Sequence, residues 1–251
     1  MLGRFAPRDA RDRMIVGLDV PSVDEARRLV KLLGAEASFY KIGMQLVFAG
    51  GLALIDELAA AGKRIFLDMK LLDIDNTIAG AVGSIARLGV TFTTIHGYPK
   101  AMRAAVAGRP GGGSGLLAVT VLTSMDDADL RAAGYAGEAA ALVEKRAAAA
   151  QRSGMDGIVC APSEVSAVRR IVGPKMAIVT PGIRPAGAAA GDQKRVMTPA
   201  EAIAAGADYI VLARPVIAAA DPGAAARSII AEIEKSHRER EHGEGLLDRA
   251  G

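Results

Sequence analysis

The sequence has few of the residues that mark several classes of protein. It contains no tryptophan, aromatic residues make up 4% of the chain, and Cys160 is its single cysteine. One cysteine cannot form an intrachain disulfide bond, which fits a reducing compartment. No apolar run reaches the length that crosses a bilayer, and the first 13 residues lack the apolar core of a signal peptide. The sequence therefore predicts a cytoplasmic protein with no membrane association.

The net charge is also small. The 31 basic and 28 acidic side chains leave a formal charge of +3. We find no basic run with interleaved aromatic residues, so we expect no nucleic-acid partner. The slightly basic balance is compatible with a small anionic ligand.

Strand-like and helix-like segments alternate along the 251 residues. The predicted strands are Arg13–Val20, Ser38–Met44, the stretch that begins at Arg64, Phe92–Tyr98, Leu116–Thr123, Gly157–Ala161, Met176–Gly182 and Tyr209–Pro215. The predicted helices are Pro21–Leu33, Leu52–Ala61, Asn76–Leu88, Glu138–Ser153, Ser163–Ile171 and Gly223–Lys235. Eight apolar strands that alternate with amphipathic helices predict an α/β fold, a closed parallel (β/α)8 TIM barrel.

No change in composition marks a second domain. We therefore assign residues 13–235 to one catalytic barrel and residues 1–12 to an N-terminal extension. Residues 236–251 form a charged tail, which we expect to be flexible.

The third predicted strand carries charge where a buried strand is normally apolar. Asp68 and Lys70 are two residues apart and leave the strand on the same face, and Asp73 follows three residues later. Desolvating such charges is costly unless each has a partner, so the Asp-x-Lys-x-x-Asp pattern indicates a functional site. The alternative is a structural ion pair at the strand end, with Asp73 or Asp75 capping the next helix.

Charged and polar residues also end other predicted strands. This set comprises Asp19, Lys41, Asp68, Lys70, His96, Thr123, Arg184 and Arg214. In a (β/α)8 barrel the carboxyl ends of the strands form the active site, so we expect these side chains to converge there. His96 fits a structural role at a strand end equally well.

Two arginines near the end of the chain suggest a phosphate site. Arg184 follows the seventh predicted strand and Arg214 follows the eighth, and the loops after these strands commonly bind phosphate in this fold. The guanidinium group offers a planar fork of donors to phosphate oxygens. The Gly- and Ala-rich loop 184–196 could close over an anion and bring Gln193 to it. The Gly-rich run Pro110–Gly115 lacks the Lys-Ser/Thr of a P-loop, so we interpret it as a turn.

The chain resembles the bacterial orotidine 5′-phosphate decarboxylases from about Met14 to Ile233. The resemblance rests on GLDV at 17–20, YKIGMQL at 40–46, FLDMKLLDIDNT at 66–77, AVTVLTSM at 118–125, TPGIRP at 180–185, GDQKRVMTP at 191–199 and ARPV at 213–216. It implies that the enzyme converts orotidine 5′-phosphate to UMP and CO2 as a homodimer, with no cofactor and no metal.

The resemblance also implies a role for each matching residue. Lys70 would be the proton donor in a charged array with Lys41, Asp68 and Asp73, where Asp73 reaches the site of the partner subunit. Asp19 and Lys41 would hold the ribose, with Asp73 and Thr77 reaching it across the interface. Thr123, with Ser124 beside it, would meet the pyrimidine. Gln193, Arg214 and the backbone at Ala213 would bind the phosphate, with Arg184 nearby.

Two residues depart from the family pattern. Asp75 replaces the usual proline and Ala213 the usual glycine, but neither change removes a charged group.

Two rival functions remain. Keto-gulonate phosphate decarboxylase and hexulose phosphate synthase share Asp-x-Lys-x-x-Asp but use magnesium, with a glutamate ligand on the second strand. Lys41 stands on that strand here, and an ammonium cannot ligate a metal. A non-catalytic phosphate-binding barrel is the other rival, and it would be expected to lack part of the charged array.

Overall fold

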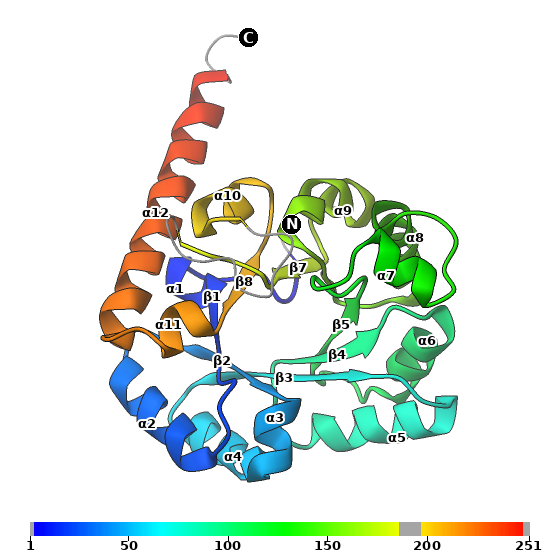
Figure 1. Ribbon diagram of the computed structural model, residues 1–251, viewed down its shortest axis with the longest axis horizontal. Coiled ribbons are helices and arrows are strands. Elements are labelled where there is room, and N and C mark those ends of the chain that lie inside the picture. The colour runs from blue at the N-terminus through cyan, green and yellow to red at the C-terminus, as the bar shows by residue number, and fades with distance from the viewer. Residues whose placement is uncertain (1–2, 186–196, 248–251) are drawn as a thin grey trace.

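A closed barrel of eight parallel strands forms the centre of the molecule, as the sequence predicted (Figure 1). The computed structural model describes residues 3–185 and 197–247. Strands follow one another around the barrel in chain order, and β1 pairs with β8 to close it. They are β1 (Met14–Gly17), β2 (Phe39–Gly43), β3 (Arg64–Leu71), β4 (Phe92–His96), β5 (Gly115–Val119), β6 (Gly157–Val159), β7 (Ala177–Thr180) and β8 (Tyr209–Leu212).

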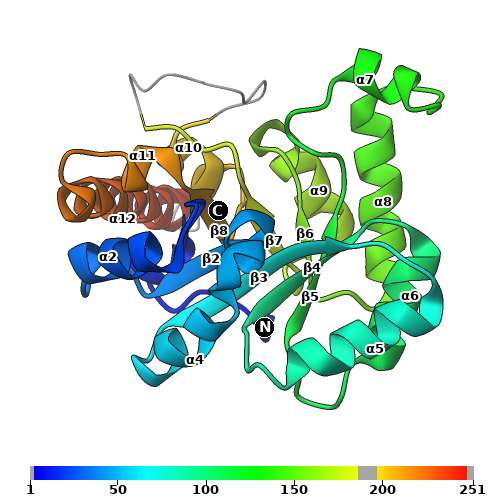
Figure 2. The ribbon, with the colours of Figure 1, turned by 60° about the horizontal axis from the view of Figure 1, so that its bottom comes forward.

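Helices surround this barrel (Figures 1 and 2). They are α1 (Ala10–Arg13), α2 (Val23–Leu33), α3 (Met44–Leu46), α4 (Ala53–Ala60), α5 (Asp75–Ala86), α6 (Pro99–Gly108), α7 (Asp127–Ala132), α8 (Ala139–Ser153), α9 (Val165–Val172), α10 (Pro199–Ala204), α11 (Arg214–Ile217) and α12 (Pro222–Leu247). A π-helical turn (Val47–Gly51) joins α3 to α4, and a 3-10 turn (Pro162–Glu164) precedes α9. Within the two described ranges, no helix is long and apolar enough to cross a membrane.

The sequence-based assignment missed several helices. Both α6 and α10 begin with a proline, which suits the first helical turn because its missing N–H would have no partner there. Neither segment is among the helices predicted from the sequence. The last helix continues past Lys235, its predicted end, to Leu247. The Gly-rich run Pro110–Gly115 forms a turn that leads into β5, as expected.

The amino end of the barrel is filled by aromatic side chains. Phe39, Phe66, Phe92 and Tyr209 are buried in one apolar cluster, and Phe5 of the N-terminal segment packs against it. The Tyr209 hydroxyl donates a hydrogen bond of 2.7 Å to the Phe5 carbonyl. Because the described residues pack this end, we expect a ligand to enter from the carboxyl ends of the strands, where the charged residues lie.

Candidate active site

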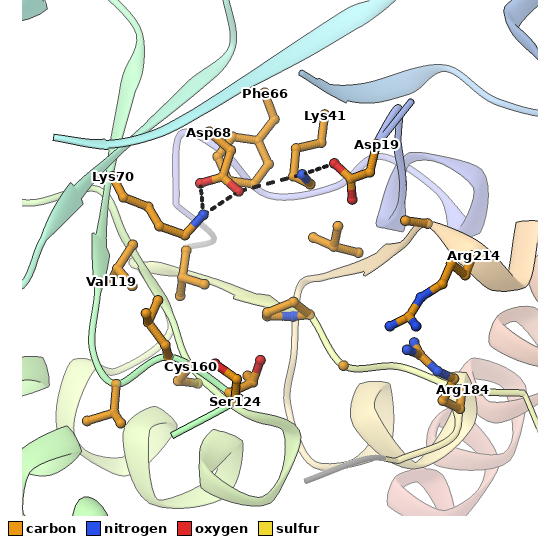
Figure 3. A pocket seen from close by; sticks show the side chains of 18 residues that line it. Asp19, Lys41, Phe66, Asp68, Lys70, Val119, Ser124, Cys160, Arg184 and Arg214 are labelled. Atoms are coloured by element: carbon orange, nitrogen blue, oxygen red, sulfur yellow. Dashed lines mark hydrogen bonds and ion pairs between the residues drawn. The ribbon is translucent and has the colours of Figure 1, made fainter. Parts of the chain in front are cut away.

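A cavity of about 450 Å³ lies at the carboxyl end of the barrel (Figure 3). Its walls include eight of the residues that the sequence singled out, namely Asp19, Lys41, Asp68, Lys70, Thr123, Arg184, Ala213 and Arg214. They come from segments that are far apart in the chain but line one cavity at the same end of the barrel.

Four charged side chains form a continuous chain of ion pairs along one wall (Figure 3). The Lys70 ammonium lies 2.8 Å from both carboxylate oxygens of Asp68. Lys41 lies 3.7 Å from Asp68 and 2.8 Å from Asp19. Positive and negative groups therefore alternate from β3 to the segment after β1, and each charge has an opposite neighbour.

The alternation of charges matters because two of these side chains are largely buried. The Asp68 and Lys41 side chains are only 11% and 12% exposed. Burial by itself raises the pKa of Asp68, but the charges of Lys41 and Lys70 outweigh it and hold that pKa below its ordinary value. For Lys41, burial lowers the pKa, yet the charges of Asp68 and Asp19 leave it above its ordinary value. Both groups therefore stay ionised at neutral pH.

The backbone is irregular where it presents Lys70. Lys70 has a φ of 48°, the one positive φ at a non-glycine residue in the described chain. Here β3 slips against β4, since Leu67 pairs with Thr93 while Leu71 pairs with Ile95. A bulge of this kind re-aims side chains and is common beside active sites. A positive φ costs a residue with a Cβ about 1–2 kcal/mol, so surrounding contacts must hold it.

Sequence reasoning missed the residue that lies opposite this bulge. Thr94 is fully buried, its hydroxyl accepts a 2.8 Å hydrogen bond from the Lys70 backbone N–H, and it donates one of 2.9 Å to Asp68. A threonine inside a strand is unremarkable in sequence, and its contacts depend on the bulge. No sequence signal could have identified it.

Arg184 and Arg214 point toward each other on another wall of the cavity (Figure 3). Arg214 begins α11 directly after β8, and Arg184 follows β7. Burial, and then the positive charge of Arg214, lower the pKa of Arg184. Two converging guanidinium groups repel one another unless an anion lies between them, so this arrangement fits a phosphate.

Apolar side chains separate the two charged regions of the cavity. The lining here comprises Phe66, Val119, Val121, Leu122, Val159, Cys160, Pro181 and Val211, with Thr123 and Ser124 after β5. The apolar members were not predicted as site residues, because in sequence they look like ordinary strand residues. A flat heterocycle would find apolar contacts there and hydroxyl groups at its edge.

Three of the other candidates do not line this cavity. Asp73 and Thr77 are exposed and do not line the cavity of their own chain. His96 is absent from the lining, and its pKa is lowered by burial and by the charges of Arg146 and Lys70. Gln193 lies outside the described residues.

Both departures from the family pattern are accommodated locally. Ala213 has a φ of −113°, so its backbone does not lie in the left-handed region that favours glycine. Asp75 is the first residue of α5, where its negative charge interacts favourably with the positive end of the helix dipole. Its carboxylate also lies 3.6 Å from the Lys100 ammonium.

The fold and cavity define a class of protein, a (β/α)8 barrel with a charged site at the carboxyl ends of its strands. Residues 12–229 match the model of the orotidine 5′-phosphate decarboxylase / HUMPS family. The chain belongs to this family.

Similar proteins agree with this assignment. An orotidine 5′-phosphate decarboxylase of Methylobacterium sp. (strain 4-46) is 61% identical over 92% of this chain and 99% of that protein. One from Rhodopseudomonas palustris (strain HaA2) is 59% identical over 90% and 96%. A crystal structure of the Lactobacillus acidophilus enzyme has a TM-score of 0.77 at 36% identity, covering 91% of this chain and 99% of that one.

No group of three or more potential metal ligands occurs among residues 3–185 and 197–247. The position on β2 where the magnesium-using relatives need a carboxylate carries Lys41, whose ammonium is already paired with Asp19 and Asp68. The cavity residues therefore do not fit a metal site of that kind.

Proposed function

We propose that this protein is an orotidine 5′-phosphate decarboxylase, which releases CO2 from the substrate and forms UMP in de novo pyrimidine biosynthesis. The observation that carries this proposal is one cavity with a carboxylate-paired ammonium on one wall and two converging guanidinium groups on another. The single cysteine and the pathway both fit a cytoplasmic location.

Lys70 is the proposed proton donor. When the C6–CO2 bond breaks, its electron pair stays on C6 in the plane of the ring, where the π system cannot delocalise it. Stabilisation must then come from a positive charge already in place, and the Lys70 ammonium supplies one. The ammonium then gives its proton to C6, so that a C–H bond replaces the C–C bond.

Asp68 and Lys41 hold that ammonium in place. Asp68 binds Lys70 through both carboxylate oxygens, and Lys41 lies 3.7 Å from the same carboxylate on its other side. Because these ion pairs are already formed before substrate binds, little reorganisation is needed during the reaction. Asp19 and Lys41 are proposed to bind the ribose hydroxyls, and Thr123 the pyrimidine.

Arg184 and Arg214 are proposed to bind the phosphate, together with the backbone at Ala213 and with Gln193. The phosphate does not react, so its binding energy can orient the ring against Lys70. Burial and then the positive charge of Arg214 lower the pKa of Arg184, and an anion between the two groups would offset that repulsion, which supports this assignment.

A second copy of the chain is proposed to complete each site. Asp73 and Thr77 are exposed on the segment after β3, away from their own cavity. Large apolar side chains are exposed on the segments after β2 and β3, including Phe48 at 82% and Ile74 at 72%. An apolar surface of this kind fits a homodimer that brings Asp73 and Thr77 to the partner's site.

The test is the loss of substrate absorbance when orotidine 5′-phosphate is added in the presence of EDTA. We expect full turnover after metal removal. A strict Mg²⁺ requirement would instead favour the keto-gulonate phosphate decarboxylase or hexulose phosphate synthase reactions. Calorimetric titration with UMP, run beside the assay, distinguishes a phosphate-binding barrel, which would bind UMP without turnover.

A further inference from the structure

One buried hydroxyl connects the two charged residues that the proposed reaction depends on most. Thr94 Oγ1 accepts from the Lys70 backbone N–H at 2.8 Å and donates to Asp68 Oδ1 at 2.9 Å. A carboxylate can only accept hydrogen bonds, so the Thr94 proton must point to Asp68 and an oxygen lone pair must face Lys70. The directions of both bonds are therefore fixed.

The bulge explains why this position matters. Between the pairs Leu67–Thr93 and Leu71–Ile95, β3 has three residues, Asp68 to Lys70, and β4 has one, Thr94. At such a slip the neighbouring strand does not offer the Lys70 N–H the backbone carbonyl that a regular ladder would provide. The Thr94 hydroxyl takes the place of the missing backbone acceptor, at a residue whose φ of 48° needs support.

We propose that Thr94 is a positioning residue for decarboxylation, which sets the location of the Lys70 ammonium by tying its backbone to the Asp68 carboxylate. This inference rests on the proposed function. Thr94 is absent from the cavity lining, so it acts through Lys70 and Asp68 and not on the substrate.

The adjacent residue provides a matched control. Thr93 is also fully buried on β4, but its hydroxyl has no hydrogen-bond partner among the described residues. Thr93→Val therefore makes the same chemical change in the same strand without breaking a hydrogen bond between described residues. Thr94→Val breaks two contacts and leaves a buried N–H without its acceptor.

Thr94→Val should lower kcat about 10- to 100-fold relative to Thr93→Val, because a shift of about 1 Å at a reacting group has an effect of that size. The dissociation constant for UMP should stay within about threefold, since the phosphate site is untouched. Thr94→Ser, which keeps the hydroxyl, should restore most of the rate. A kcat for Thr94→Val within about twofold of Thr93→Val would overturn the proposal.

Exchange of the C6 proton of UMP with D2O gives a second readout, followed by NMR. In this exchange Lys70, as the neutral amine, must remove the proton that it delivers in the forward reaction, so the exchange rate reports the position of the Lys70 Nζ without decarboxylation. We expect Thr94→Val to slow exchange at saturating UMP and Thr93→Val to leave it unchanged. If Thr94→Val does not fold, Thr94→Ala against Thr94→Ser takes its place, and equal rates would overturn the proposal. Absence of turnover in the wild type would reject the proposed function instead.

Discussion

The positive φ of Lys70 leads to an unusual stability prediction. Replacing Lys70 by alanine or by glycine removes the same ammonium and the same ion pair with Asp68, so those losses cancel when the two variants are compared. What remains is the backbone. At a φ of 48° a Cβ costs about 1–2 kcal/mol, and glycine avoids that cost. Against this, glycine lowers the free energy of unfolding by about 0.4–1 kcal/mol relative to alanine, because it gives the unfolded chain more conformational freedom. We expect Lys70→Gly to be the more stable variant by about 1 kcal/mol.

Urea unfolding of both variants measures this difference, and thermal unfolding should show it as about 2–4 °C for a chain of this size. Ala141, exposed in α8, provides the control, because Ala141→Gly should destabilise the helix by about 1 kcal/mol. Both Lys70 variants should lack turnover. If Lys70→Ala were the more stable of the two, the strain assigned to this residue would be refuted, and activity near the wild-type level would refute its role as proton donor.

The remaining predictions concern phosphate, assembly and pH. Arg214→Ala should weaken UMP binding and lower kcat/KM for orotidine 5′-phosphate by the equivalent of about 2–5 kcal/mol, but lower kcat/KM for orotidine far less. The exposed control Arg227→Ala should change neither UMP binding nor kcat/KM. Equal losses of kcat/KM on both substrates would contradict phosphate binding by Arg214. Mixing inactive Lys70→Ala and Asp73→Ala subunits should restore about a quarter of wild-type activity, one intact site in four, whereas Lys70→Ala mixed with Asp68→Ala should restore none; failure of the first mixture despite subunit exchange would place Asp73 in its own chain's site. Asp12 is buried, which raises its pKa, but hydrogen bonds from Arg8 and the charge of Arg64 hold that pKa below its ordinary value, so its stabilisation is present above about pH 4 and lost as the pH falls further. The stability difference between wild type and Asp12→Asn should therefore shrink in acid, and a constant difference from pH 7 to pH 2 would show that the pKa is not lowered.

The sequence predicted the barrel because its strands are apolar runs and its charged residues fall where those runs end. Asp19, Lys41, Asp68 and Lys70 could be grouped from that pattern alone. Their pairing could not, because the 3.7 Å contact between Lys41 and Asp68 depends on the register of β2 against β3. Thr94 was beyond prediction for a similar reason, since only the slip of β3 against β4 gives its hydroxyl two partners.

Helices were predicted less completely than strands. The segment that forms α6 begins after a glycine and a tyrosine and contains Pro99, which resembles a loop in sequence. The shared site stays a prediction, because it depends on a second chain that one sequence can suggest only through resemblance. The proposed place of Gln193 likewise stays a prediction.

The partial exposure of Lys70 has a consequence for proton supply. Decarboxylation consumes one proton per turnover, since a carboxylate leaves as neutral CO2 and C6 gains hydrogen. The Lys70 side chain is 26% exposed, against 12% for Lys41. In the proposed reaction, Lys70 becomes a neutral amine after it gives up its proton and must regain a proton from water before the next cycle. Its access to the cavity would provide that route once UMP has left, so product release and reprotonation of Lys70 would occur through the same opening.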